Sequence, residues 1–173
     1  MPYAITLRLD DADCAPVHTL LQALAASGIT EPGRGHAPRI TLVEYPDNAD
    51  AKALAATAAG LSVQWKRLPV RFAHLGVSPG APSALWLAPV TNSALLVRHA
   101  QLLARHPGSG PWASGAWVPH LMLNADLADT NVLAAATASA GAAFAPFTAT
   151  VSHVELIRTE PLELLFSGPL AEG

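Results

Sequence analysis

PRITL at residues 38–42 and PHLML at residues 119–123 are two copies of one short pattern. Each copy begins with proline after a glycine-containing loop and continues with residues that favour a strand. Arg39 in the first copy and His120 in the second lie 81 residues apart in a chain of 173. This spacing predicts an internal duplication, with one copy of the motif in each half of the protein.

The positions within each copy indicate which side chains act together. Alternate residues of a strand point to the same face, so Arg39 shares a face with Thr41, and His120 shares one with Met122. If the two halves pack about a pseudo-twofold axis, the two pairs face each other across a central cleft. These residues are therefore the first candidates for a functional site.

The elements around the two copies follow a repeated order. We expect strands at residues 3–9, 39–45, 61–68, 70–77, 83–90, 117–123, 147–158 and 162–167. Helices are expected at about residues 17–25, 49–59, 92–103 and 129–141. Strands separated by helices and joined by hairpins predict an α+β fold. The predicted architecture is bilobal, with two antiparallel sheets lining the central cleft and the helices outside.

The composition restricts the function classes. Apolar residues make up 51% of the chain and charged residues 13%, which excludes a disordered chain and a coiled coil. The net charge of −3 argues against a surface that grips long nucleic acid, so no such partner is expected. A local basic cleft for a small anion remains compatible with this charge. We expect a monomer.

Cysteine usage and hydropathy indicate the compartment. The single cysteine, Cys14, has no partner for an internal disulfide and does not form a zinc cluster. No uninterrupted apolar run reaches the roughly 18 residues of a membrane span, and no signal core follows the start. We therefore expect a cytoplasmic protein with no membrane partner. No spacing of histidines and carboxylates matches a metal site, so neither a metal nor a cofactor is expected.

In its two motifs and in the order of its elements, the sequence resembles the two-histidine phosphoesterases, the superfamily of 2′-5′ RNA ligases and cyclic phosphodiesterases. That superfamily carries two His-x-Thr/Ser motifs, commonly Pro-His-x-Thr-Leu, one in each pseudo-symmetric lobe. The resemblance extends from the opening strand YAITLRL, through Phe72 and residues 83–90, to the closing strands from Val154. It implies a single domain over residues 1–173 made of two interleaved lobes. If the chain is an enzyme, the resemblance implies a metal-independent hydrolase of 2′,3′-cyclic phosphodiesters.

Both motifs depart from the family pattern. In the family, one histidine is a general base, the other is a general acid, and the hydroxyls hold the phosphate oxygens. Here Arg39 replaces the first histidine and Met122 replaces the second hydroxyl, whereas Thr41 and His120 match. Arginine stays protonated and has no acceptor, so Arg39 binds anions but does not transfer protons. The resemblance therefore makes His120 and Thr41 the catalytic candidates and Thr41 a phosphate-binding one, and the chemistry of arginine adds Arg39 to the phosphate-binding candidates.

Each candidate also has an ordinary structural explanation. Arg39 could pair with Glu44 or Glu31 at the surface, His120 could be a core histidine, and Thr41 fits any strand. His36 precedes Arg39 by three residues and could replace the missing base only if the chain bends at Pro38.

Further candidates lie outside the motifs. Trp112 and Trp117 flank the second motif and could stack on a nucleobase or complete the core. Trp65 and Trp86 alternate with apolar residues and are predicted to be core. Several strand residues could line the same cleft, although the sequence does not fix their facing: Arg67, Arg71, His74, His153 and Arg158.

Three functions are compatible with these residues. The first is a degenerate family member that binds a small phosphoester or nucleotide, with weak or lost phosphodiesterase activity. The second is an active cyclic phosphodiesterase that uses His120 with Thr41 and Arg39. The third is a structural or interaction domain without a ligand. Arg39 favours binding over turnover, because it keeps affinity for phosphate and removes one proton-transfer group.

Overall fold

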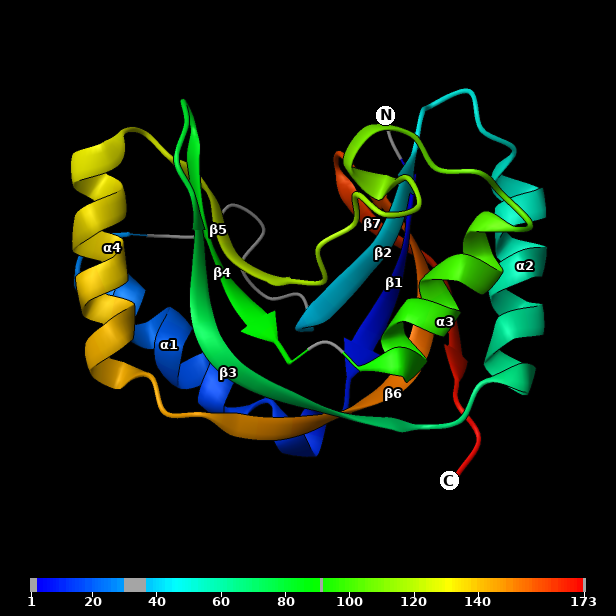
Figure 1. Cartoon of the computed structure of the whole chain (residues 1–173), viewed down its shortest axis with the longest axis horizontal. Coiled ribbons are helices and arrows are strands. Elements are labelled where there is room, and N and C mark those ends of the chain that lie inside the picture. The colour runs from blue at the N-terminus through cyan, green and yellow to red at the C-terminus, as the bar shows by residue number, and fades with distance from the viewer. Residues whose placement is uncertain (1–2, 30–36, 91, 173) are drawn as a thin grey trace.

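The computed structural model describes residues 3–29, 37–90 and 92–172, and these form an α+β protein (Figure 1). The strands are β1 (Tyr3–Leu9), β2 (Arg39–Tyr45), β3 (Leu68–Ser78), β4 (Ser83–Pro89), β5 (Leu121–Leu127), β6 (Phe147–Thr159) and β7 (Leu162–Pro169). The α-helices are α1 (Ala15–Ala26), α2 (Ala51–Gln64), α3 (Ser93–Leu103) and α4 (Thr130–Ala143). Short 3-10 turns occur at Asp11–Asp13 and Gly110–Trp112.

The strands form one seven-stranded antiparallel sheet in the order β1-β2-β5-β4-β3-β6-β7, and β1 also pairs with β6. We expected two sheets, and two connections join the strands into one. One connection is the pair Ile40–Leu121, which links β2 to β5. The other is the 13-residue strand β6, which pairs with β3 near its start and with β1 along most of its remaining length. A strand of this length satisfies backbone groups on both sides of the molecule, so the hydrogen bonding stays continuous.

The strand pairings of the two halves match each other. Strand β1 pairs with β2 and β6, and strand β4 pairs with β5 and β3. Figure 1 shows β3, β4 and β5 on one side of the molecule and β1, β2 and β7 on the other. Strand β2 meets β5 between the two sides, and these two strands carry the motifs of the sequence analysis.

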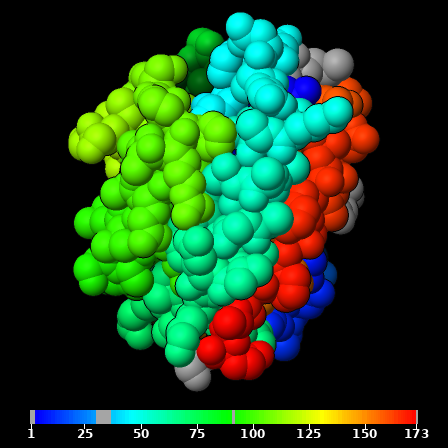
Figure 2. All heavy atoms as spheres, turned by 90° about the vertical axis from the view of Figure 1, so that its right-hand side faces the viewer, coloured from blue at the N-terminus to red at the C-terminus, as the bar shows by residue number. Residues whose placement is uncertain are grey.

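The helices begin at local caps and pack outside the strands. The side chains of Asp50, Asn92 and Asp129 accept hydrogen bonds from the first backbone N–H groups of α2, α3 and α4. Helix α1 packs against α4, whereas α2 packs against β6 and β7. Figure 2 shows α2 on the outer face, between α3 and the C-terminal strand. None of the helices in the described ranges is both long enough and apolar enough to cross a bilayer.

Several predicted boundaries differ from the observed ones. Residues 61–64 continue α2 instead of starting a strand, because Leu54, Ala58 and Leu61 form one buried stripe through the glycine at position 60. The strand predicted at residues 117–123 is β5, which begins at Leu121. The fourth helix continues past residue 141 to Ala143. In the two helices, packing outweighs the local signal of glycine, whereas β5 begins only after Pro119, which lacks a backbone N–H for the ladder.

Candidate functional site

The structure brings the two motifs together in one pocket. The pair Ile40–Leu121 places β2 next to β5, and both of these side chains are buried. Arg39 and Thr41 flank Ile40, so they point to the opposite face from it. His120 and Met122 flank Leu121 in the same way. All four side chains line one pocket of about 330 Å³.

A β-bulge at the same place in each strand adds a third residue to the pocket. The pairing of β1 with β2 shifts so that Leu42 is inserted, and Leu42 and Val43 are both buried. The pairing of β4 with β5 shifts in the same way, and Leu123 and Asn124 are both buried. Each extra residue reverses the alternation beyond it. The carboxylate of Glu44 and the methyl group of Ala125 consequently line the pocket with the motif residues.

His120 is held in one orientation. Its Nδ1 lies 2.8 Å from the carbonyl oxygen of Val118. A carbonyl only accepts, so Nδ1 carries the proton and Nε2 has the free lone pair when the ring is neutral. The ring lies between two indoles, with centroids 5.7 Å from Trp86 and 6.2 Å from Trp112. His120 can therefore accept a proton at Nε2, or donate it there once charged.

Arg39 contacts a buried carboxylate that the sequence analysis did not consider. Its Nε donates to the carbonyl oxygen of Ala37 at 3.0 Å, and its Nη1 lies 3.8 Å from Oε2 of Glu155. Glu155 is 2% exposed, and its Oε1 lies 3.7 Å from Nη1 of Arg8. Two guanidinium groups thus share one buried carboxylate beside the pocket. Of the two partners considered from the sequence, Glu31 lies outside the described residues.

Thr41 is held by a neighbouring strand and by the loop before the second motif. Its Cα pairs with Thr6 on β1, and its carbonyl oxygen accepts a hydrogen bond of 3.1 Å from the indole N–H of Trp117. The loop before the second motif is therefore attached to the strand of the first motif. The Thr41 side chain lines the same pocket as Arg39.

The two flanking tryptophans differ in their surroundings. Trp112 is half-buried and lines the motif pocket. Trp117 is 8% exposed and stacks on the ring of His99 at 4.3 Å, so most of its surface belongs to the core. Both indoles, with His120 and Met122, also line a second pocket of about 290 Å³ beside the first. Little of Trp117 is available for a ligand.

Trp86 was predicted to be core, but it lines the second pocket. It pairs with Gly76 across β3 and β4, and a Cβ on that glycine would lie 2.5 Å from the indole ring. The glycine therefore makes the space in which the indole lies against the sheet. The alternation of Trp86 with Leu85 and Leu87 correctly indicates two faces, but it does not say which face lines a pocket. Trp65, by contrast, is buried as predicted.

Glu44 is the acidic group of the motif pocket. The indole of Trp112 lines the same pocket beside its carboxylate. Burial raises the pKa of Glu44, the negative charge of Glu160 raises it further, and the polar N–H of Trp112 opposes both. Within the described residues, no ion pair involves Glu44. Strict alternation along β2 would place this side chain on the face opposite Arg39, so the sequence analysis missed it.

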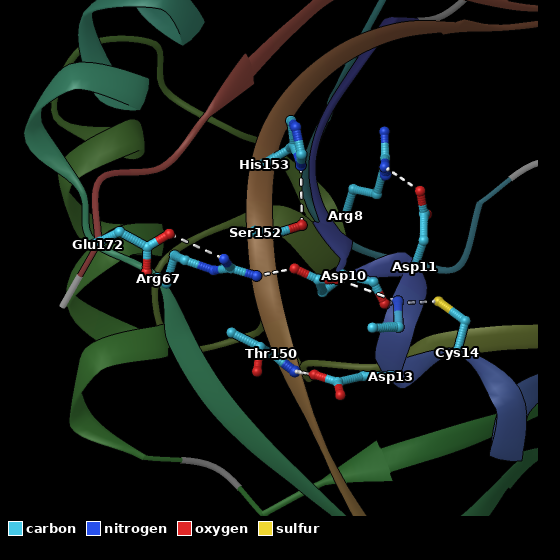
Figure 3. A network of polar contacts seen from close by, with 11 residues as sticks. Arg8, Asp10, Asp11, Asp13, Cys14, Arg67, Thr150, Ser152, His153 and Glu172 are labelled. Carbon is cyan, nitrogen blue, oxygen red and sulfur yellow. Dashed lines mark hydrogen bonds and ion pairs between the residues drawn. The ribbon is translucent and has the colours of Figure 1, made fainter.

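The arginines whose facing was undetermined do not line either pocket. Arg67 contacts Asp10 and Glu172 in the polar network that Figure 3 shows, where Arg8 also donates to Asp11 at 2.9 Å. Arg158 pairs with Glu163 at 2.5 Å, and Arg71 is exposed on β3. Arg39 is therefore the arginine that lines the motif pocket among the described residues.

The remaining histidine candidates lie elsewhere or outside the described ranges. His153 pairs with Arg8 across β6 and β1, and its Nδ1 shares a hydrogen bond of 2.9 Å with Ser152 (Figure 3). Burial lowers the pKa of His153, and the charge of Arg8 lowers it further. His36 lies outside the described residues. Within the described ranges, no group of histidine, cysteine and carboxylate side chains is arranged to hold a metal ion.

Solved structures share this fold over their whole length. The protein TT0787 of Thermus thermophilus superimposes with a TM-score of 0.67 at 14% identity, covering 99% of each chain. LigT of E. coli complexed with ATP has a TM-score of 0.60 at 11% identity, covering 98% of this chain and 97% of that one. Usb1 of Kluyveromyces marxianus has a TM-score of 0.55 at 13% identity, covering 98% of each chain.

The sequence comparison gives the family. No curated protein matches the sequence. The family model described as the 2′-5′ RNA ligase superfamily matches residues 9–162. Since this match covers most of the chain, and the fold agrees with it, the protein belongs to the 2′-5′ RNA ligase superfamily.

Proposed function

We propose that the motif pocket binds a small phosphoester or a nucleotide, and that phosphodiesterase activity is weak or lost. The observation that carries the proposal is that Arg39, Thr41 and His120 line one pocket. Three structures of E. coli LigT contain ATP, 3′-AMP or NADP⁺, so this fold accommodates nucleotides. The pocket of this chain offers a guanidinium, a hydroxyl and an imidazole to such a ligand.

Each group has a defined part in phosphate binding. The guanidinium of Arg39 donates charge-assisted hydrogen bonds to phosphate oxygens, which are about twice as strong as neutral ones. The hydroxyl of Thr41 donates to a third oxygen from the same strand. The 3.8 Å between Arg39 and Glu155 is longer than a hydrogen bond, so a phosphate oxygen at a shorter distance competes well with this carboxylate.

Turnover needs more than binding. In the hydrolysis of a 2′,3′-cyclic phosphate, the oxygen of water bonds to phosphorus while one P–O ester bond breaks. A base takes a proton from the water, and an acid gives one to the departing ribose oxygen. His120 can fill one of these roles through Nε2, whereas Arg39 can fill neither. The loss of one acid–base partner lowers the rate by on the order of 10²–10⁴.

One observation favours the alternative of an active cyclic phosphodiesterase. The hydrogen bond from Nδ1 of His120 to Val118 orients Nε2 and holds the tautomer that an acid–base catalyst needs. In that alternative, water or solvent hydroxide supplies the second proton transfer. The third alternative, a domain without a ligand, predicts no binding of nucleotides at all.

The second pocket adds a surface for the remainder of the ligand. Trp86 and Trp112 flank His120 and line this pocket, whereas Trp117 forms its buried part. Stacking of a base on an aromatic side chain contributes roughly 1–3 kcal/mol. We propose that a base or another flat group stacks on Trp112, which lines both pockets, while its phosphate contacts Arg39. The matching strand pairs support a single domain of two interleaved lobes.

Calorimetric titration with 3′-nucleotides and with sulfate tests the proposal. Arg39→Gln should weaken binding about tenfold or more, since it removes a charged donor worth about 1.5–3 kcal/mol. Arg71→Gln is the matched control, because Arg71 is exposed on β3 outside both pockets. If Arg39→Gln leaves the affinity unchanged, Arg39 is not the anchor for phosphate.

A further inference from the structure

The motif pocket is polarised along β2. Arg39 and Thr41 lie at the start of the strand, and Glu44 lies near its end. Strands rise about 3.3 Å per residue, so the Cα atoms of Thr41 and Glu44 are roughly 10 Å apart. The pocket thus carries a cation at one position and a carboxylate at another, and both side chains line the same space.

The carboxylate of Glu44 has unused acceptor capacity. A carboxylate has about four acceptor positions, and the polar group that acts on this one is the indole N–H of Trp112. The charged neighbour that acts on Glu44 is another carboxylate, Glu160, at the turn between β6 and β7. In the described part of the chain, Glu44 takes part in no ion pair. The half-buried carboxylate of Glu44, next to the carboxylate of Glu160, therefore lacks the hydrogen-bond donors that would stabilise its charge.

We infer that Glu44 determines ligand specificity by selecting phosphoesters that carry N–H donors at the end opposite the phosphate. This inference rests on the proposed function, and it names the side chain that recognises the end of the same ligand opposite the phosphate. With its phosphate at Arg39 and Thr41, a nucleotide spans the pocket and brings the edge of its base to Glu44. Guanine presents a ring N–H and an amino group side by side, and these match the two oxygens of a carboxylate.

The second strand shows why this selection depends on one side chain. Ala125 occupies the corresponding place after the bulge in β5 and also lines the pocket. A methyl group neither donates nor accepts, so it offers no hydrogen bond to a ligand. Near the far end of the pocket, recognition of polar groups on the ligand therefore depends on Glu44.

The test compares ligands that differ only in the donors. We expect guanosine 3′-monophosphate to bind about tenfold more tightly than inosine 3′-monophosphate, which lacks the amino group. In Glu44→Gln this ratio should fall to about one, because the amide presents one acceptor and one donor group. Glu163→Gln is the matched control: Glu163 is an exposed carboxylate on β7 that pairs with Arg158, and the ratio should stay near ten.

A second pair of ligands identifies the source of the donors. Phosphoethanolamine and ethyl phosphate are both shorter than a nucleotide, and they differ only in the ammonium group of phosphoethanolamine. The wild-type protein could prefer phosphoethanolamine to ethyl phosphate, lose this preference in Glu44→Gln, and show no preference for guanosine 3′-monophosphate. That result would keep the selection of N–H donors by Glu44 but assign the donors to an amine ligand. Equal affinities within both pairs in the wild-type protein overturn the inference while the proposed function stands. The absence of binding for every phosphoester overturns the proposed function itself.

Discussion

Strands β2 and β5 have the same shape and different chemistry. Each runs for seven residues, belongs to a motif that directs two alternate side chains into the pocket, and has a bulge that directs a third. On β2 the three side chains are a guanidinium, a hydroxyl and a carboxylate, and their counterparts are the imidazole of His120, directly before β5, and a thioether and a methyl group on β5. The backbone of the pocket is therefore close to symmetric, whereas nearly all of its charge comes from one strand.

The neighbouring strands extend this difference. Thr41 on β2 pairs with Thr6, which pairs with Glu155 on β6. Met122 on β5 pairs with Trp86, which pairs with Gly76 on β3. One side of the pocket is thus ionic and hydrogen-bonded, and the other is aromatic. This division suits a ligand with a charged end and a flat apolar end better than it suits symmetric acid–base catalysis.

Making the two strands chemically equivalent should have the largest effect. The double change Arg39→His and Met122→Thr recreates both family motifs on β2 and β5. We expect hydrolysis of a 2′,3′-cyclic mononucleotide to rise by on the order of 10²–10⁴ over the wild type, because a second proton-transfer group becomes available. The rate of product formation measures the effect.

Two control variants test whether this gain in hydrolysis rate depends on His120 and on the position of the new histidine. Adding His120→Ala to the double variant should abolish it, and Arg71→His, on the exposed surface of β3, should not produce it. Strong wild-type turnover that survives His120→Ala would show that the chemistry lies elsewhere. His36 and His153 would then be the next residues to change.

The sequence predicts the symmetric part of this site better than the asymmetric part. The bounds of β2 and the pairing of the two motifs followed from local alternation and from the repeat. Glu44 did not, because a bulge at Leu42 reverses the alternation, and a bulge depends on the neighbouring strand. Glu155 did not, because it lies within an apolar run of β6 and its partners, Arg8 and Arg39, come from other strands. Contacts across strands are set by tertiary structure, which one sequence does not display.

Removing the carboxylate of Glu155, which balances the charges of Arg8 and Arg39, should have the next largest effect, and this effect is on stability. Glu155→Gln leaves Arg8 and Arg39 without their shared carboxylate, so we expect the free energy of unfolding to fall by about 3 kcal/mol. Sulfate should restore more stability to this variant than to the wild type, because the anion replaces the lost charge. Urea denaturation with and without sulfate measures both effects.

A surface carboxylate provides the control for this experiment. Glu163→Gln breaks the exposed pair with Arg158 and should change stability by less than about 1 kcal/mol. If sulfate stabilises Glu155→Gln and the wild type equally, the anion does not bind beside Arg8 and Arg39. The phosphate position proposed above would then be wrong.

Glu44→Gln should have the smallest effect on stability, and the size of this effect should depend on pH. Burial and the charge of Glu160 raise the pKa of Glu44 in the folded protein above its value in the unfolded chain. The ionised carboxylate therefore destabilises the fold, and this cost appears as the pH rises from the ordinary pKa of 4.5 through the folded one. At neutral pH we expect Glu44→Gln to be more stable than the wild type by a few tenths of a kcal/mol, up to about 1 kcal/mol. At a pH well below 4 the difference should vanish, because both side chains are then neutral. Thermal denaturation across this range measures the difference, and a variant that is less stable at neutral pH would show that Glu44 supports the fold instead of being held in the pocket at a cost.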